Sequence, residues 1–386
     1  MASALTSSSI KELAHGCGFE LAGIAVACPS EDFERFQAWR DEGRAGEMTY
    51  LTDHRGDLRS DPRNLLPSAQ TILCVGKLYN TPHPYSADLS DSDRGWISRY
   101  AWGPDYHEVM RRGLESLLER IAALHPEPFE WRICVDTAPL LERSYARAAG
   151  LGWIGKNTCL INQQQGSWFF LGELLLSIPL APDLPAPERC GTCRRCIDAC
   201  PTQAIVPVGD GHWSLDARLC ISYLTIEKRG AIPRELAEKT ANHVFGCDIC
   251  QDVCPWNRRA PVNDDPAFQP SQFAPPLERL AGLTEEGFRS TFRHTAVWRT
   301  KYAGFLRNVA IAMGNSGHPE RREVLESLTR HPEQSVASAA RHALSVFDEH
   351  LHYTEKTERI ETSESAAEPV VRLLKTTPDW PVAISG

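Results

Sequence analysis

Eight cysteines within residues 188–259 constrain this 386-residue chain more than any other feature of its sequence. The first four have the form Cys-x2-Cys-x2-Cys-x3-Cys-Pro starting at Cys190, the spacing that binds a 4Fe–4S cluster in bacterial ferredoxins. A second run, Cys-x2-Cys-x3-Cys-Pro, starts at Cys247 and lacks one cysteine, which Cys220 upstream can supply. Two clusters need eight thiolates, so the segment predicts two 4Fe–4S clusters.

The spacing also predicts how the thiolates divide. In two-cluster ferredoxins, the cysteine before the proline binds the cluster of the other run. We therefore expect one set made of Cys190, Cys193, Cys196 and Cys254, and another made of Cys200, Cys220, Cys247 and Cys250. Zinc is the alternative metal, since Cys-x2-Cys pairs bind it as well. The five thiols outside these sets are expected to be buried in the core: Cys17, Cys28, Cys74, Cys134 and Cys159.

Composition excludes several classes of protein. Apolar residues make up 42% and charged residues 24%, which is an ordinary globular balance rather than a disordered or coiled-coil one. No apolar stretch approaches the ~18 residues that span a bilayer, and the first residues do not resemble a secretory signal. We expect a cytoplasmic protein without membrane contact, whose clustered cysteines bind metal rather than form disulfides.

The order of patterns predicts an α+β chain of several domains. In residues 1–180, apolar runs and helical spacing alternate, which is typical of an α/β domain. Residues 181–275 form the cluster-binding domain, residues 276–350 a helical domain of paired helices, and residues 351–386 a loose tail. In the first domain we expect strands at Leu21–Ala27, Ile72–Lys77, Trp131–Asp136 and Trp168–Ile178, and helices at Ser7–Glu20, Asp105–Leu124 and Pro139–Ala149.

Asp136 is the candidate acid. It ends a predicted strand, and apolar neighbours such as Val135 and Leu140 would leave its carboxyl group poorly hydrated. Desolvation raises a carboxyl pKa, so Asp136 would be able to donate a proton. The alternative, which composition alone favours, is that Asp136 caps the helix expected to start near Pro139.

A glycine-rich segment follows that helix. Its letters fit G-x-G-x-x-G from Gly150 to Gly155, but it follows a helix rather than a strand, so a dinucleotide site is not expected. Lys156, Asn157 and Thr158 come next and fit a cofactor contact and a simple turn equally well. His107, in the first turn of a predicted helix, is interpreted as a surface residue rather than a ligand.

Together these segments resemble the epoxyqueuosine reductase family. The similarity covers most of the chain and includes GEMTYL (46–51), SRYAWGPDYH (98–107), VDTAPLLER (135–143), AGLGWIGKNT (149–158), CISYLTIE (220–227), GCDICQDVCPWNR (246–258) and LRNVAIAMGN (306–315). The resemblance implies reduction of the epoxide of epoxyqueuosine, at the wobble position of tRNA, to an alkene. It also implies cobalamin beside two 4Fe–4S clusters, and a cobalamin-binding α/β domain followed by ferredoxin-like and HEAT-like helical domains.

The resemblance also implies roles for single residues. Asp136 matches the proton donor of the family, and the eight cysteines match its cluster ligands. The expected cobalamin contacts are Asp136, Thr137, Trp153, Lys156, Asn157, Thr158, Ser222, Tyr223 and Asp248. The chain has no Asp-x-His-x-x-Gly motif, so we expect no axial histidine on cobalt. The loop between Cys200 and Cys220 looks longer than in the family, which makes Cys220 the least secure ligand.

The net charge of −9 argues against a general nucleic-acid binder, yet the family acts on tRNA. Residues 287–319 contain no acidic side chain, and basic and aromatic residues alternate there, which predicts a surface for phosphates and stacked bases. The basic residues are Arg289, Arg293, Arg299, Lys301 and Arg307, and the aromatic ones are Phe292, Trp298, Tyr302 and Phe305. The alternative is that these aromatic rings form a helix core.

Three more functions remain open on sequence alone. A cobalamin-dependent reductive dehalogenase would share the cofactors, although such proteins typically carry a twin-arginine signal, which is absent here. The second is an electron-transfer module without its own substrate, and the third is an RNA-binding protein with structural zinc. For the reductase, we expect a monomer that receives electrons from a low-potential donor, whose identity the sequence does not indicate.

Overall fold

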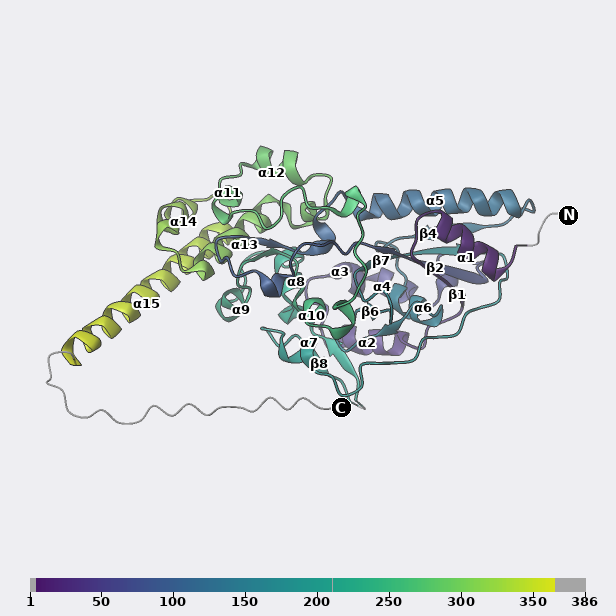
Figure 1. The fold of residues 1–386 in the computed structure, drawn as a ribbon, viewed down its shortest axis with the longest axis horizontal. Helices are drawn as coiled ribbons and strands as arrows, with labels where there is room; N and C mark the ends of the chain where they lie inside the picture. Colours follow the sequence, from purple (N-terminus) through teal and green to yellow (C-terminus); the bar gives the residue numbers. More distant parts are fainter. Residues whose placement is uncertain (1–4, 210, 365–386) are drawn as a thin grey trace.

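The computed structural model describes residues 5–209 and 211–364 (Figure 1). Its largest sheet has four antiparallel strands in the order β1-β2-β7-β4. These strands are β1 (Leu21–Val26), β2 (Thr71–Leu78), β7 (Phe169–Leu176) and β4 (Trp131–Cys134), close to the predicted ones. The strand β4 lies at an edge of the sheet, and its residue Trp131 is 48% exposed.

Helices cover both faces of this sheet because the apolar side chains of its strands alternate. Leu73 and Val75 of β2 pack with α1 (Ser7–Gly16) and α5 (Tyr106–Leu124) on one face, whereas Ile72 and Cys74 lie in the cluster on the α6 face. The predicted helices at these positions are confirmed, with α6 shorter than expected (Glu142–Ala148). Short helices precede β2, namely α2 (Phe33–Asp41), α3 (Thr49–Thr52) and α4 (His54–Leu58).

The cysteines lie on short elements beside this domain. Two hairpins frame the region, β5 (Trp153–Ile154) with β6 (Leu160–Ile161) and β8 (Ile205–Pro207) with β9 (Trp213–Leu215). The helices are α7 (Arg195–Asp198), α8 (Ile221–Ile226), α9 (Arg234–Lys239) and α10 (Ile249–Asp252). Strand β10 (His243–Phe245) pairs in parallel with β3 (Trp96–Ile97), which connects the cysteine-bearing part of the chain to the segment that leads into α5.

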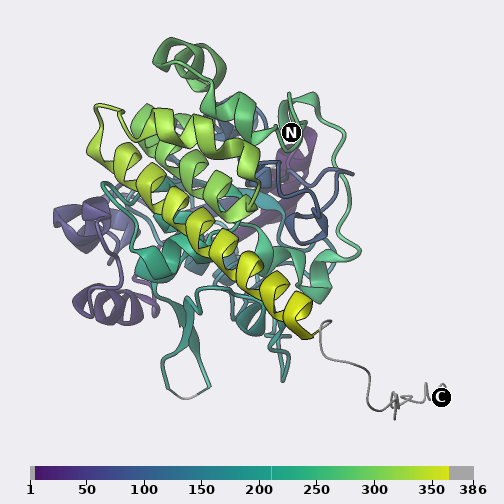
Figure 2. The ribbon, with the colours of Figure 1, turned by 90° about the vertical axis from the view of Figure 1, so that its left-hand side faces the viewer.

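The C-terminal part is helical, as predicted. It contains α11 (Leu277–Ala281), α12 (Glu285–Phe292), α13 (Lys301–Ser316), α14 (Arg322–Leu328) and α15 (Gln334–Glu364). Figure 2 shows α15 lying across the neighbouring helices. A Cβ atom on Gly314 of α13 would lie 2.6 Å from the Cβ atom of Ala343, so these helices approach closely only because this residue is glycine.

The expected loose tail is helical where the structure describes it. Helix α15 continues to Glu364, because residues 351–364 are rich in Glu, Lys and Arg, which propagate a helix already begun by packed residues. The remainder of the expected tail, residues 365–386, lies outside the described residues. Among the helices in the described ranges, none combines the length and the apolar character needed to cross a membrane.

A buried pair of residues on α13 joins the C-terminal helices to the cysteine-bearing elements. Arg307 is 1% exposed and donates to the carbonyl oxygens of Leu224, Lys228 and Gly230 at 2.7–2.8 Å. Its neighbour Asn308 donates to the carbonyl oxygens at the end of α8 and in β10. Arg307 was expected to contact phosphate and instead holds the backbone around α8 in place.

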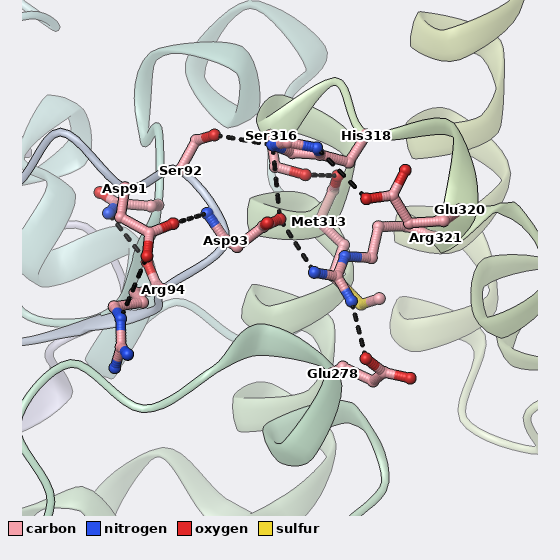
Figure 3. Close-up of polar contacts among 11 residues, drawn as sticks. Asp91, Ser92, Asp93, Arg94, Glu278, Met313, Ser316, His318, Glu320 and Arg321 are labelled. Atoms are coloured by element: carbon pink, nitrogen blue, oxygen red, sulfur yellow. Dashed lines mark hydrogen bonds and ion pairs between the residues drawn. The ribbon is translucent and has the colours of Figure 1, made fainter.

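A second junction is a partly exposed ion-pair network around the buried side chain of Arg321 (Figure 3). Asp93, His318 and Glu320 place three potential metal-ligand atoms within 4.8 Å of one another. However, the Arg321 guanidinium bonds Asp93 at 2.9 Å and Glu278 at 3.0 Å. Because this guanidinium would repel a cation, we interpret the group as an ion-pair network that joins the loop before β3 to the C-terminal helices.

Replacing Arg307 by Ala leaves the carbonyl groups around α8 buried without donors. We expect the free energy of unfolding to fall by about 3 kcal/mol or more, since buried unpaired polar groups cost about 1–3 kcal/mol each. Thermal unfolding followed by circular dichroism measures the change. Arg112→Ala, an exposed site on α5, is the control and should change the stability by less than about 0.5 kcal/mol. Equal melting temperatures for both variants would contradict this role.

Candidate active site

A cavity of about 1490 Å³ opens where the sheet domain, the cysteine-bearing elements and the start of the C-terminal helices meet. Typical small-molecule pockets measure about 300–1,000 Å³, so this cavity suits a much larger ligand. Its lining comes from α2, from residues 136–144 after β4, from the β5–β6 turn, and from the β8–β9 hairpin. Cys190 of the first cysteine run and Arg299 of the C-terminal part complete it.

Asp136 lies at this cavity and does not cap a helix. Helix α6 begins at Glu142 and lacks a side-chain cap, so the capping interpretation was wrong. The Asp136 backbone adopts a φ of 48°, which is unusual for a residue with a side chain. Its side chain is 41% exposed, and its Oδ2 atom lies 3.1 Å from His107 Nε2 and 3.8 Å from Arg299 Nη1.

The charges around Asp136 reverse the expected pKa shift. Burial favours the neutral acid, but His107 and Arg299 outweigh burial, and the pKa of Asp136 lies below its ordinary value. Burial also disfavours a charged imidazole, yet the carboxylates of Asp105 and Asp136 raise the pKa of His107 to about 9. At neutral pH the site therefore holds an ionised carboxylate beside a protonated imidazole. The interpretation of His107 as a mere surface residue was wrong.

The turn between β5 and β6 reaches both cysteine runs. Lys156 Nζ donates to the carbonyl oxygens of Gly191 at 2.7 Å and Cys193 at 2.9 Å, and Asn157 Nδ2 donates to the carbonyl oxygen of Cys250 at 3.2 Å. Lys156 and Thr158 also line the cavity. This turn therefore connects the cavity wall with the backbone that carries the thiols.

The residues expected to contact cobalamin separate into two groups. Those on the cavity wall are Asp136, Thr137, Lys156 and Thr158. The remainder do not line it: Trp153, Asn157, Ser222, Tyr223 and Asp248. Trp153 packs against Trp256 with ring centroids 5.0 Å apart, and the hydroxyl group of Tyr223 accepts a hydrogen bond from the backbone of Glu47. The structure gives these two a packing or anchoring role.

The structure brings the eight thiols together in the two predicted sets. Burial raises the pKa of the Cys196 thiol to about 12, and its nearby thiols add to this shift; they are Cys254, Cys190 and Cys193. For Cys247 the neighbours are Cys220 and Cys200, and Cys250 adjoins Cys247 and Cys220. Each cysteine that precedes a proline thus lies with the other run, which is the crossed arrangement.

The five remaining cysteines are not all core residues. Cys74 and Cys134 are buried as expected, but Cys28 is exposed and Cys17 is partly exposed. Cys159 is also partly exposed, and its thiol lies within hydrogen-bonding reach of Cys250. The apolar neighbours of these cysteines in the sequence did not reveal that Cys28 lies just beyond the end of β1.

The basic segment near α12 and α13 is only partly a surface. Phe292 and Phe305 belong to the core, and Trp298 and Tyr302 pack against it, so the expected stacking surface was wrong. These rings follow the apolar spacing of a helix and fill the space between helices. The basic side chains of Arg289, Arg293 and Lys301 are exposed.

Arg299 faces the cavity instead of a free surface. Its Nε atom lies 2.7 Å from Glu227 Oε1, and its guanidinium lies 5.3 Å from the ring centre of Tyr50. Together with its approach to Asp136, these contacts make Arg299 a residue of the candidate active site.

Comparison with known proteins agrees with this geometry. Residues 189–257 match a family model described as a 4Fe–4S double cluster binding domain, and residues 59–137 match one described as epoxyqueuosine reductase QueG, DUF1730. Fold and site therefore define an iron–sulfur oxidoreductase. Epoxyqueuosine reductases of Xanthomonas campestris pv. campestris and Escherichia coli are 43% and 42% identical to this chain. The first alignment covers 85% of this chain and 92% of the relative, and the second covers 80% of each. The chain belongs to the epoxyqueuosine reductase family.

Solved structures support the same assignment. A crystal structure of epoxyqueuosine reductase with an epoxyqueuosine-modified tRNA-Tyr stem loop is 29% identical, has a TM-score of 0.79, and covers 88% of this chain and 89% of that one. The enzyme of Streptococcus thermophilus is 32% identical with a TM-score of 0.77, over 88% and 90% of the two chains. The mixed helix and sheet fold with its cluster-binding part is therefore the fold of this family.

Sequence reasoning missed two acidic residues near Asp136. Glu142 starts α6, and Glu173 lies in the middle of β7 with 0% exposure. Glu173 had a visible signal, since it is the single charged residue in the apolar run FFLGELLL. No such feature of the sequence marks Glu142, because an acidic residue in the first turn of a helix is common on any protein surface.

The charge state of His107 can be tested directly. Asp136→Asn removes a carboxylate that stabilises the imidazolium, so the pKa of His107 should fall from about 9 towards its ordinary ~6.5. An NMR pH titration of the His107 ring measures the shift, with Asp264→Asn, an exposed site, as control. Because the folded pKa is raised, the stability His107 contributes is complete below about pH 6.5 and is lost as pH rises through about 9. A ring that titrates near 6.5 in both proteins would contradict the ion pair.

Proposed function

We propose that this protein reduces the epoxide of epoxyqueuosine in tRNA to the alkene of queuosine. The observation that carries the proposal is one cavity lined by both Asp136 and Cys190, in which the Asp136 carboxylate is paired with protonated His107 behind it. Support comes from relatives named epoxyqueuosine reductase and from a related structure with an epoxyqueuosine-modified tRNA stem loop.

The chemistry defines what the site must supply. Conversion of an epoxide into an alkene and water consumes two electrons and two protons. When bound, the two 4Fe–4S clusters supply single electrons and cobalamin supplies a reduced, nucleophilic metal, which is the part of the reaction that protein side chains perform poorly. The side chains of the cavity then have to bind the substrate, exclude water and deliver protons.

The donor sets fit these cofactors. The first thiol set, Cys190, Cys193, Cys196 and Cys254, would hold the cluster at the cavity wall, and the set around Cys220 would hold the second cluster. Cobalamin would occupy the large cavity, where Asp136, Thr137, Lys156 and Thr158 would line it. Since Lys156 also holds the backbone of the first cysteine run, it would keep that cluster close to the cavity.

Asp136 is the proposed general acid, and His107 is its proton source. The proton on His107 Nε2 lies 3.1 Å from Asp136 Oδ2. Because Asp136 is ionised at rest, the proton first passes from His107 Nε2 to Asp136; as the epoxide C–O bond breaks, the departing oxygen gains negative charge and takes this proton from Asp136. Arg299 keeps the resting carboxylate oriented. A structure of the Bacillus subtilis enzyme is described as having its catalytic aspartate loop swung out of the active site, which supports a role for such a loop.

The exposed basic side chains of Arg289, Arg293 and Lys301 are the proposed phosphate contacts. They lie on or beside α12 and α13, in a stretch without acidic residues. We infer that α11–α15 form a HEAT-like unit that presents them, and that this local charge lets a protein of net charge −9 hold a polyanion.

The role of Asp136 predicts a specific loss. Asp136→Asn keeps the shape of the side chain and removes its acid, so turnover should fall by about 10²–10⁴-fold. Iron content and corrinoid binding should remain as in the wild type. The assay is mass analysis of epoxyqueuosine-containing tRNA for loss of one oxygen, under a low-potential reductant, with Asp264→Asn as control. Unchanged turnover in Asp136→Asn would refute the assignment.

Charge reversal tests the tRNA contacts. The double variant Arg289→Glu, Arg293→Glu should bind tRNA more weakly and with a flatter dependence on salt, by about one unit of the log–log slope per lost phosphate contact. Fluorescence anisotropy with a labelled anticodon stem loop, at several salt concentrations, measures both. Arg112→Glu, exposed on α5, is the control for net charge. If the double variant and the control bind alike, tRNA contacts another face.

A further inference from the structure

Three carboxyl groups lead from the cavity into the interior of the sheet domain. The backbone N–H of Asp136 donates to Glu142 Oε1 at 2.5 Å. The carboxyl group of Glu142 lies in turn within hydrogen-bonding reach of the carboxyl group of Glu173. Two carboxyl groups form a hydrogen bond only if they share a proton, so this contact requires one proton on the pair.

Glu173 lies where a charge has nothing to stabilise it. Its neighbours in register are Cys74 of β2 and Cys134 of β4, and its side chain is fully buried. Within the described residues, no N–H or hydroxyl group bonds either of its carboxyl oxygens. An ionised carboxylate in such a place is costly, so burial, together with Glu142, raises the pKa of Glu173 well above its ordinary value.

Glu142 lies between this buried acid and the cavity. Burial and the nearby charge of Asp136 raise the pKa of Glu142 to about 7. The charged and titratable groups that act on the pair come from several elements: Cys74 on β2, Cys134 on β4, Arg143 on α6, Asp136 after β4, His107 on α5 and Arg59 after α4. The positively charged groups among them stabilise the ionised form of Glu142 and not that of Glu173. The shared proton therefore belongs chiefly to Glu173.

We propose that Glu142 and Glu173 share one proton at neutral pH and thereby form a clamp that holds the Asp136 backbone in its strained, catalytically useful conformation. Protonated Glu173 donates to Glu142, and the oriented Glu142 carboxylate accepts the N–H of Asp136. The clamp opposes the tendency of Asp136 to leave a φ of 48°, a conformation that costs free energy for a residue with a side chain. Glu142 and Glu173 are thus positioning residues, and the proposal rests on the proposed function of Asp136.

Loss of the shared proton releases the clamp. Two adjacent ionised carboxylates in the interior repel each other, so Glu142 would move away and free the Asp136 backbone. The proposal therefore predicts that turnover falls at alkaline pH as the pair loses its shared proton. In the variant Glu173→Gln the amide donates in place of the acid and cannot titrate, so the part of this fall that the pair causes should be absent.

The test uses the complete holoenzyme and four variants: Glu142→Ala, Glu142→Gln, Glu173→Gln and, as an exposed control on α5, Glu119→Gln. Glu142→Ala should lower kcat by about 100-fold, as for a misplaced catalytic group, with the KM for tRNA unchanged. Glu142→Gln keeps an oxygen for the Asp136 N–H and should restore most of kcat. If the alanine variant does not fold, the two glutamine variants still carry the test.

Two readouts are independent of activity. Infrared difference spectroscopy should show a protonated-carboxyl band at neutral pH that disappears in Glu173→Gln and persists in Glu119→Gln. The amide proton of Asp136 should have a downfield NMR shift that Glu142→Gln keeps and Glu142→Ala loses. Absence of the infrared band, or a Glu142→Ala variant that keeps both kcat and the amide shift, would overturn the clamp.

Failure of the clamp differs from failure of the proposed function. If the Asp136→Asn enzyme is active, Asp136 is not the general acid, and the clamp has no catalytic role. An inactive Asp136→Asn enzyme together with a fully active Glu142→Ala enzyme would retain the proposed function and refute the clamp alone.

Discussion

The buried carboxylate of Asp248 is the contact on which the arrangement of this molecule depends. It lies between Cys247 and Cys250, is 2% exposed, and accepts hydrogen bonds from Trp96 Nε1 at 3.0 Å and from the Arg99 backbone at 2.7 Å. A buried carboxylate is tolerated only with such donors. The bonds tie the second cysteine run to the segment that leads into α5, and α5 carries His107. One carboxylate therefore joins the second cysteine run to the segment that precedes His107.

The proton-handling groups and the thiols reach the cavity from different parts of the chain, and each part has its own anchor. Arg307 fixes α8, just after Cys220, through backbone carbonyl groups. Lys156 fixes the loop of the first cysteine run in the same manner. Such bonds to main-chain carbonyls hold the position of a segment whatever its side chains do. The cavity can then be lined by groups chosen for chemistry, while these bonds from Arg307 and Lys156 to the main chain provide the rigidity.

The parts of this structure that sequence predicted are those with local causes. Cysteine spacing and the prolines after Cys200 and Cys254 predicted two crossed thiol sets, because chain geometry over a few residues limits which thiols can meet. Alternating apolar runs predicted the strands. The prediction made from the aromatic residues near α13 was wrong. The spacing that buries Phe292 and Phe305 in a helix core is also the spacing of an exposed stacking surface. The amino-acid composition is the same for a buried aromatic core and for an exposed stacking surface. Only the packing of neighbouring helices decides which of the two forms.

The pairing of His107 with Asp136 could not be predicted for a related reason. The two residues are 29 positions apart and meet only because the N-terminus of α5 lies beside the end of β4. Sequence reasoning treated Asp136 as a carboxyl group among apolar neighbours and so expected a raised pKa. The cations that lower it come from α5 and from the segment before α13, which no local window of the sequence contains. Apolar neighbours in the sequence can suggest the pKa shift that burial causes. The sign of the net pKa shift, however, depends on the nearest charged groups in the folded protein.

A lowered pKa is compatible with the work of an acid. A stronger acid transfers its proton more readily to a departing oxygen, but less of it is protonated at neutral pH. In the mechanism that we propose, the two requirements fall on different residues. Asp136 would provide the acid strength, and His107, with a pKa of about 9, keeps a proton 3.1 Å away. A pair of this kind delivers a proton at neutral pH although its carboxylate is ionised at rest. Its efficiency then depends on a fixed distance between Nε2 and Oδ2, which is why the backbone of Asp136 needs a contact as firm as the one that Glu142 makes.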